Sequence, residues 1–178
     1  MIGLNYALIK KNDIANGLGV RVSLFVSGCT HHCKGCFNQE TWDFNYGKEY
    51  TLQTQKEILE ALSFKHISGL TLIGGEPMEP SNQKVLADLV KEVKEKFPKK
   101  NIWCYTGYNF ENDLLLDGRA RCSVTDELLR NIDVMIDGEF EIDKKNISLK
   151  FRGSENQRII LVQDSLKKGK TIFSDLMW

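Results

Sequence analysis

Stretches that suit β-strands alternate along this chain with stretches of helical periodicity, and this alternation limits the folds open to it. Apolar and β-branched residues predict five strands, over Val20–Ser27, Gly69–Ile73, Ile102–Tyr105, Val134–Ile136 and Arg158–Val162. Strands that alternate with helices form a parallel sheet with right-handed crossovers and flanking helices. The sequence therefore predicts an α/β fold.

Three helices are expected between these strands, and capping signals indicate where they begin. Thr54, with Glu57 three residues later, offers a capping box for the first helix. Ser81 is expected to cap the second helix, which has the clearest helical repeat, and Thr125 the third. The tail after Ser165 has weak periodicity and is assigned to no element.

A glycine-rich or polar motif directly follows each of the first four predicted strands. These motifs are the cysteine loop (Cys29–Cys36), the GGEP turn (Gly74–Pro77), the TGY turn (Thr106–Tyr108) and the DGEF loop (Asp137–Phe140). Parallel strands place their carboxyl ends on one rim, where ligands bind in such folds, so we expect the four motifs to form one site. A single domain over residues 1–178 is expected. It is too short for an eight-unit barrel of roughly 250 residues, which favours an open partial (β/α) barrel.

Composition narrows the class of partner and the compartment. Lysine and arginine together number 24, as do aspartate and glutamate, so the net charge gives no reason to expect binding to nucleic acid or to a membrane surface. The first residues lack the apolar core of a signal peptide, and no stretch is long and apolar enough to span a bilayer. We therefore expect a cytoplasmic protein.

Cys29, Cys33 and Cys36 lie within eight residues, which indicates metal or redox chemistry. The chain has five cysteines, an odd number that suits a disulfide framework poorly. A four-iron cubane normally takes four cysteine thiolates, whereas this loop offers three, which would leave one iron open to a ligand that is not protein.

A zinc site is the alternative interpretation of the same loop. Zinc prefers four tetrahedral nitrogen or sulfur ligands, and His31, His32, Cys104 or Cys122 could complete such a set. Tight cysteine spacing suits either metal centre, so the cysteines alone leave both open.

The CxxxCxxC spacing, followed one strand later by the GGEP turn, resembles the radical S-adenosylmethionine superfamily. The resemblance implies a [4Fe-4S] cluster on Cys29, Cys33 and Cys36, with S-adenosylmethionine bound at the open iron and cleaved reductively to a 5′-deoxyadenosyl radical. No catalytic side chain is implied beyond the cluster and the cofactor. The cofactor-binding residues implied are Gly35, Cys36, Phe37, Gly74, Gly75, Glu76, Pro77 and Thr106.

Further blocks in the same order resemble, more narrowly, the family that activates anaerobic (class III) ribonucleotide reductases. They are Asn16-Gly17, Gly28-Cys29, Gly35–Asn38 with Thr41-Trp42, the GGEP turn, Trp103 with the TGY turn, the DGEF loop and Arg152–Arg158. Two positions depart from the pattern: Gly35 precedes the third cysteine where most of the superfamily has an aromatic residue, and Glu76 replaces an aspartate.

The narrower resemblance implies that the substrate is a protein. The chain would generate a glycyl radical on the large subunit of an anaerobic ribonucleotide reductase, with electrons from a flavodoxin- or ferredoxin-type donor. Two alternatives stay open: an activase for another glycyl-radical enzyme such as pyruvate formate-lyase, and a zinc-binding interaction module without catalysis.

Several neighbouring residues also have ordinary structural interpretations. We expect Trp42 and Trp103 to pack in the core or at the rim, and His31 and His32 to be solvated loop histidines. Tyr108 is expected to be a pocket wall or a buried aromatic residue.

No specific function is predicted for the other two cysteines or for two polar blocks. Cys104 should behave as a small buried hydrophobe, while Cys122 is either a reactive thiol or without a role. Asp137–Phe140 and Arg152–Arg158 are turns and strand entrances, or else parts of a cofactor rim or partner surface.

Overall fold

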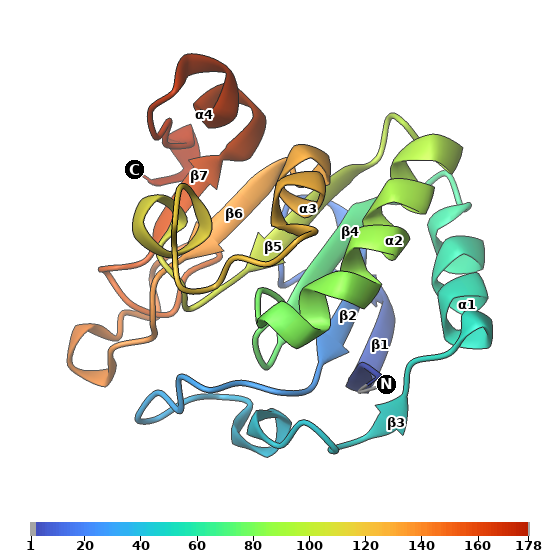
Figure 1. Ribbon diagram of the computed structural model, residues 1–178, viewed down its shortest axis with the longest axis horizontal. Coiled ribbons are helices and arrows are strands. Elements are labelled where there is room, and N and C mark those ends of the chain that lie inside the picture. Colours follow the sequence, from blue (N-terminus) through green and yellow to red (C-terminus); the bar gives the residue numbers. More distant parts are fainter. Residues whose placement is uncertain (1–2, 178) are drawn as a thin grey trace.

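The computed structural model describes residues 3–177 and contains one seven-stranded mixed sheet (Figure 1). The strands stand in the order β3-β1-β2-β4-β5-β6-β7. Their bounds are β1 (Asn5–Asp13), β2 (Val20–Val26), β3 (Lys48–Glu49), β4 (Ile67–Gly74), β5 (Asn101–Tyr105), β6 (Val134–Asp137) and β7 (Arg158–Leu161).

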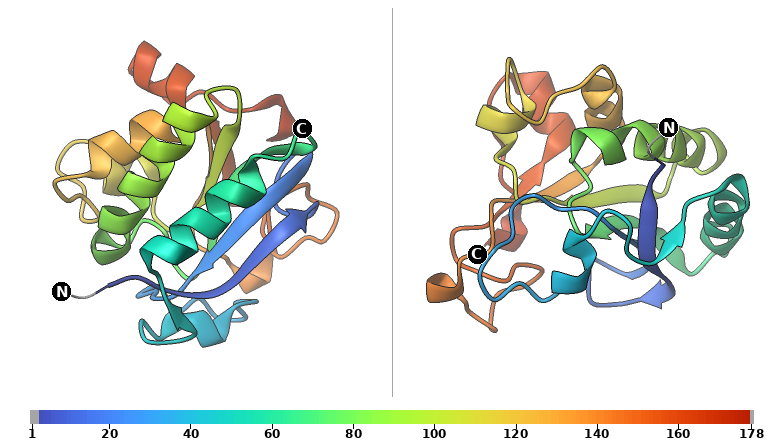
Figure 2. Two further views of the ribbon diagram at one scale, coloured as in Figure 1. Left: turned by 90° about the vertical axis from the view of Figure 1, so that its right-hand side faces the viewer. Right: turned by 60° about the horizontal axis from the view of Figure 1, so that its bottom comes forward.

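The longer helices lie on one face of this sheet (Figure 2). The α-helices are α1 (Leu52–Leu62), α2 (Pro80–Lys96), α3 (Thr125–Asn131) and α4 (Val162–Lys168). The short helical turns are η1 (Gln39–Trp42), η2 (Phe110–Leu114), η3 (Ile142–Lys144) and η4 (Asp175–Met177). The α/β class predicted from the sequence is confirmed.

The expected parallel sheet is found only in the middle of the observed one. Strands β2, β4, β5 and β6 run parallel, whereas β1, β3 and β7 pair antiparallel with their neighbours. A parallel pair needs a crossover to the opposite end of the sheet. The short segment between β1 and β2 forms no crossover. The segment between β6 and β7 likewise stays at the end where β6 finishes, so each pair is antiparallel.

Two strands and one helix lie outside the sequence prediction. Strand β1 has only two buried residues, Tyr6 and Asp13, and carries Lys10 and Lys11, so its apolar signal is weak. Strand β3 has only two residues. Helix α4 begins at Val162, the residue expected to end the fifth strand, and continues into the unassigned tail.

The helices begin one to three residues earlier than the capping signals predicted. Thr51, not Thr54, caps α1: its side chain accepts from the Thr54 amide at 3.3 Å, and the Thr54 hydroxyl accepts from the Thr51 amide at 3.1 Å. Helix α2 begins at Pro80, which suits a first helical position, so Ser81 lies inside it. Thr125 is likewise the first residue of α3 rather than its cap.

Strand residues alternate between two faces of the sheet. On one face Leu24, Leu72 and Cys104 are fully buried in the core that the helices cover. On the other face the following residues, including Phe25, Ile73 and Tyr105, line a cavity. The motifs at the strand ends therefore adjoin the face that carries no α-helix.

No helix among residues 3–177 combines the length and apolar character needed to cross a bilayer.

Candidate functional site

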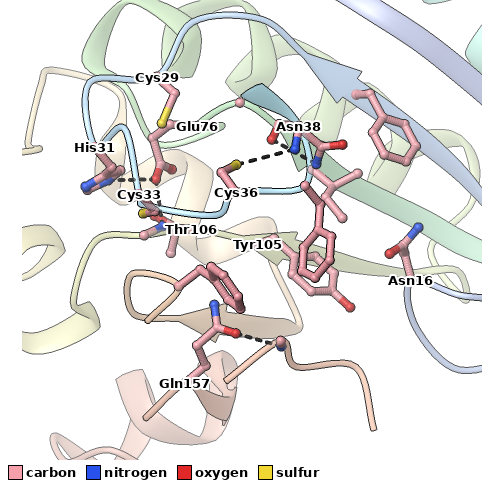
Figure 3. A pocket seen from close by; sticks show the side chains of 18 of the residues that line it. Asn16, Cys29, His31, Cys33, Cys36, Asn38, Glu76, Tyr105, Thr106 and Gln157 are labelled. Carbon is pink, nitrogen blue, oxygen red and sulfur yellow. Dashed lines mark hydrogen bonds and ion pairs between the residues drawn. The ribbon is translucent and has the colours of Figure 1, made fainter. Parts of the chain in front are cut away.

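A cavity of about 580 Å³ opens along the face of the sheet that carries no α-helix, at the carboxyl ends of the parallel strands (Figure 3). The cysteine loop follows β2, the GGEP turn follows β4, the TGY turn follows β5 and the DGEF loop follows β6. The residues of these motifs that line the cavity are Cys29, His31, Cys33, Cys36, Gly74, Gly75, Glu76, Thr106, Gly107, Gly138 and Phe140. The parallel strands thus bring four distant segments to one place.

The three clustered cysteines are free thiols that line this cavity. Burial raises the pKa of the Cys29 thiol to about 12, and burial also raises the pKa of Cys33. The Asn38 amide donates to Cys36 Sγ at 3.4 Å. A buried thiolate is costly without a compensating positive charge, so metal binding here would release protons and offset the cost of desolvation.

The cysteine loop suits a cluster in donor chemistry and in backbone shape. Thiolates are the ligands of iron–sulfur clusters, and each thiolate binds a different iron. His32 and Gly35 have positive φ angles of 51° and 76°, which give the loop its tight bends between the cysteines. Among residues 3–177 no group of three His, Cys, Asp or Glu side chains is spaced to hold one metal ion.

The GGEP turn packs directly against the cysteine loop. The Gly75 amide donates to Val26 O and the Glu76 amide to Gly28 O, both at 2.8 Å. A Cβ on Gly75 would lie 2.7 Å from Gly28 O and 2.8 Å from Thr41 O. The contact that requires glycine at position 75 is therefore the backbone just before Cys29, and a side chain there would disturb more than a cofactor.

The Glu76 side chain is almost fully buried, and protein groups already contact both its oxygens. Oε1 accepts from the Met78 amide at 2.8 Å, and Oε2 accepts from the Gly107 amide at 2.7 Å. Oε2 also lies 3.0 Å from Nε2 of His31. Glu76 lines the cavity, but its carboxylate is engaged in joining the loops around it.

His31 differs from the expected solvated histidine. Its side chain is only 5% exposed, and it contacts Glu76 through Nε2 and Glu139 through Nδ1, the latter at 2.8 Å. Burial acts to lower the pKa of His31, but the hydrogen bonds and charges of the two carboxylates raise it overall. His32 behaves differently, because it stacks on Trp42 with ring centroids 4.5 Å apart.

A second buried carboxylate, Glu79, holds the start of the cysteine loop. Its Oε1 accepts from the amide and the hydroxyl of Thr30, at 2.8 and 2.6 Å. Its Oε2 accepts from the Tyr108 hydroxyl at 3.3 Å. Burial raises the pKa of Tyr108 to about 12. Of the two expectations for Tyr108, the buried aromatic residue is the one observed.

Not every residue expected to bind the cofactor lines the cavity. Cys36, Phe37, Gly74, Gly75, Glu76 and Thr106 line it, whereas Gly35 and Pro77 are not part of the lining. Gly35 packs against Ile142, whose Cδ1 would be 2.9 Å from a Cβ at position 35. Phe37 is 66% exposed, and its ring packs against that of Phe140, with centroids 5.3 Å apart.

Cys104, Cys122 and Trp103 either pack in the core or lie outside the cavity lining. Cys104 is fully buried in the main core, as expected. Cys122 lies 3.5 Å from Gln83 Oε1, outside the cavity lining. Trp103 is 2% exposed and packs with Ile136 and Ile159 on the second face of the sheet, which confirms the packing role.

Sequence reasoning named no role for part of the cavity lining, which includes Lys10, Asn16, Phe25, Ile73, Tyr105 and Phe151. Strand alternation could have identified Phe25, Ile73 and Tyr105, because they point away from the helix-covered face. Both polar blocks contribute to the cavity lining, the first through Gly138 and Phe140 and the second through Arg152, Gly153 and Gln157. Asp137 instead accepts hydrogen bonds from Arg158 and from the Phe110 amide.

Comparison with known proteins gives consistent matches over most of the chain. A family model for a 4Fe-4S single cluster domain matches residues 15–160. The chain is 44% identical over 158 residues to the anaerobic ribonucleoside-triphosphate reductase-activating protein of Enterobacteria phage T4, covering 88% of this chain and 93% of that protein. The protein of that name from Pasteurella multocida is also 44% identical, over 88% and 96% of the two chains. The protein of the same name from Escherichia coli K12 is 38% identical, and the match covers 86% of this chain and 96% of that protein.

The matched family model favours one of the two metal interpretations. It describes a single iron–sulfur cluster, and its matched segment contains Cys29, Cys33 and Cys36. The cysteine loop is therefore better explained by a 4Fe-4S cluster than by a zinc module.

Proposed function

This chain belongs to the family of anaerobic ribonucleoside-triphosphate reductase-activating proteins and contains a 4Fe-4S single cluster domain, and from this premise we propose that it activates an anaerobic ribonucleotide reductase by generating a glycyl radical on its large subunit. One observation carries the proposal most strongly. The three thiols of the cysteine loop line the same cavity as the GGEP turn and Thr106, although these segments lie far apart in the sequence. The names of the relatives favour a reductase over pyruvate formate-lyase as the target.

The residues at the rim have complementary roles in this proposal. Cys29, Cys33 and Cys36 hold the cluster, and the supply of only three thiolates leaves a coordination position for S-adenosylmethionine. When bound, the cluster and S-adenosylmethionine supply the one-electron chemistry that the reaction requires. Gly74, Gly75 and Thr106 present backbone and a small side chain to the cavity, which leaves space beside the cysteines.

The size and position of the cavity support a small-molecule cofactor. Its volume of about 580 Å³ lies within the roughly 300–1,000 Å³ of ligand pockets. The lining combines aromatic walls, such as Phe25 and Tyr105, with polar groups, such as Asn16 and Gln157. Phe37, exposed at the mouth beside Cys36, is in a position to contact a cofactor that reaches out of the cavity.

The fold fits the same proposal. We regard the parallel strands β2, β4, β5 and β6 as the core of an open partial (β/α) barrel of the radical S-adenosylmethionine type, in one domain. A flavodoxin- or ferredoxin-type donor in the cytoplasm would reduce the cluster, since free thiols and an iron–sulfur centre suit a reducing compartment.

The test is electron paramagnetic resonance on the reduced protein mixed anaerobically with S-adenosylmethionine and the reductase. A persistent radical with the doublet splitting of a glycyl α-hydrogen is expected, and it should vanish when the target glycine of the reductase is changed to alanine. A radical product on a small molecule, formed without any reductase, would contradict the proposed activase.

Cysteine variants make the ligand assignment testable in the same preparation. Cys29→Ala, Cys33→Ala and Cys36→Ala should each lose the cluster or leave it labile, because three thiolates are already one fewer than a cubane normally takes. Cys104→Ala and Cys122→Ala are the matched controls and should keep their iron and sulfide. Equal iron loss in both groups would show that the ligands are assigned wrongly.

A further inference from the structure

His31 is the point at which the separate motifs of the rim are joined. It sits in the cysteine loop between Cys29 and Cys33, and its ring lies beside Glu76 in the GGEP turn (Figure 3). The opposite ring nitrogen lies 2.8 Å from Oε1 of Glu139 in the DGEF loop. Both ring nitrogens therefore face carboxylate oxygens, which accept hydrogen bonds and cannot donate them.

Glu76 connects His31 to the TGY turn as well. Oε2 of Glu76, the atom that faces His31, also accepts from the Gly107 amide at 2.7 Å. A Cβ on Gly107 would lie 2.7 Å from Cδ2 of His31, and the Tyr108 ring meets the imidazole edge-on at 4.4 Å. The imidazole thus occupies the space next to the TGY turn, so the turn has no room to move toward His31.

The two carboxylates that contact His31 are not equivalent. The Glu76 side chain is 1% exposed and that of Glu139 is 48% exposed. Water can replace His31 at Glu139, whereas loss of the imidazole at Glu76 would leave a buried carboxylate oxygen short of a donor. The contact with Glu76 should therefore be the one on which the arrangement of the rim depends.

We propose that His31 is a positioning residue, which sets the mutual position of the cysteine loop and the GGEP and TGY turns through its hydrogen bond to Glu76, and thereby sets the affinity for S-adenosylmethionine. This inference rests on the proposed function for the identity of the ligand. The arrangement of the loops is a property of this chain's own residues, which can be measured without ligand or cluster.

Two substitutions separate the two contacts of the ring. His31→Gln places an amide donor near the position of Nε2 and keeps a donor toward Glu76. His31→Asn places it near the position of Nδ1 and keeps a donor toward Glu139 only. His32→Asn is the matched control, because His32 lies in the same loop but stacks on Trp42 instead of contacting a carboxylate.

The first measurement is amide hydrogen exchange at Gly107 in the protein without cluster. His31→Asn should accelerate exchange at this amide, because its acceptor Glu76 is freed to move, while His31→Gln and His32→Asn should exchange as the wild type does. Unchanged exchange in His31→Asn would overturn the proposal, as would equal acceleration in His31→Gln.

The second measurement is the Kd for S-adenosylmethionine in the protein with its cluster, with iron and sulfide content determined in each variant. His31→Asn should raise the Kd by about tenfold or more, the effect of losing a buried hydrogen bond to a charged group. His31→Gln should restore the affinity to within about threefold of the wild type. Equal loss in the two variants, or the same loss in His32→Asn, would overturn the proposal.

The two measurements also separate failure of this inference from failure of the proposed function. If the wild type does not bind S-adenosylmethionine, the proposed function fails and the affinity part of the inference is overturned with it. Altered Gly107 exchange in His31→Asn would in that case still establish the positioning of the loops.

Discussion

Gly75 shows how closely the GGEP turn and the cysteine loop depend on each other. The cavity lies on one side of this residue, and the carbonyl oxygens of Gly28 and Thr41 lie on the other, within 2.8 Å of where a Cβ would stand. Backbone atoms cannot move aside as a flexible side chain can. Even the smallest side chain at position 75 therefore has to displace the segment that leads into Cys29.

Gly75→Ala is expected to impair cluster binding as well as cofactor binding. Overpacking of this kind typically lowers the free energy of unfolding by about 1–3 kcal/mol. Iron content after reconstitution, the Kd for S-adenosylmethionine and denaturant unfolding would be measured together. Gly3→Ala is the control, because a Cβ there meets its nearest neighbour at 3.8 Å. Loss of cofactor affinity with a fully retained, stable cluster would show that Gly75 contacts only the cofactor.

At the scale of elements, Arg21 in β2 connects β4, β5 and the loop before β2 through hydrogen bonds. It is fully buried, and its guanidinium donates to Thr71 Oγ1 in β4, to Asn101 Oδ1 in β5 and to Leu18 O in the loop. The Thr71 hydroxyl donates onward to Asn16 O at 2.9 Å. Arg21 thereby helps to place Asn16, which lines the far end of the cavity.

The acceptors of Arg21 are neutral, which makes this a buried cation stabilised by hydrogen bonds. Burial lowers the pKa of Arg21 to about 10, a value that still leaves it charged near neutral pH. Its guanidinium also lies 5.3 Å from the centre of the Trp103 ring, within the range of a cation–π contact. Removal of the guanidinium would leave several buried acceptors without a donor.

Arg21→Met should lower the free energy of unfolding by about 3 kcal/mol, since unsatisfied buried polar groups cost about 1–3 kcal/mol each and the methionine recovers part of the packing. Denaturant unfolding measures this loss, and hydrogen exchange should show faster opening at residues 14–19. Arg130→Met, on the exposed surface of α3, should change stability by less than about 0.5 kcal/mol. Similar values for the two variants would refute the role assigned to Arg21.

At the scale of the whole molecule, the chain after β6 returns along the sheet edge and is held there by a polar network. Arg158 in β7 donates to Asp137 at the end of β6 and to Glu111 in η2. Glu111 also accepts from the hydroxyl of Thr171 in the tail. The network joins segments from 111 to 171 beside the rim that carries the DGEF loop.

The pH dependence of stability should report on this network. Burial acts to raise the pKa of Glu111, but hydrogen bonds from Arg158 and Thr171 lower it below its usual value. A carboxyl whose pKa is lowered on folding stabilises the fold above its unfolded pKa, and this contribution is lost as the pH falls through the lowered value.

Glu111→Gln should therefore show a shallower loss of stability on acidification than the wild type. The free energy of unfolding would be measured from neutral pH into the acid range, at matched cluster content. Glu95→Gln, on the exposed side of α2, serves as the control and should follow the wild-type profile. Identical acid profiles for Glu111→Gln and the wild type would exclude a contribution from the network.

Local patterns determined the centres of the strands, the order of the motifs and the grouping of three thiols in the cysteine loop. These features depend on neighbouring residues: β-branched runs favour strands, and thiols a few residues apart reach one centre whatever the rest of the chain does. The placement of four motifs at one rim also followed from the sequence, because parallel strands that alternate with helices leave their carboxyl ends together.

Only the tertiary structure decided the direction of the edge strands, the contribution of Lys10 and Arg152 to the cavity lining and the surroundings of His31. The direction of β1 and β7 depends on where each connecting segment runs, which local propensity does not encode. His31 lies in a short polar loop whose composition predicts solvation, yet its partners are Glu76 and Glu139, the second 108 residues away. A side chain is buried or exposed according to what packs over it, and for His31 the turns that follow distant strands supply that cover.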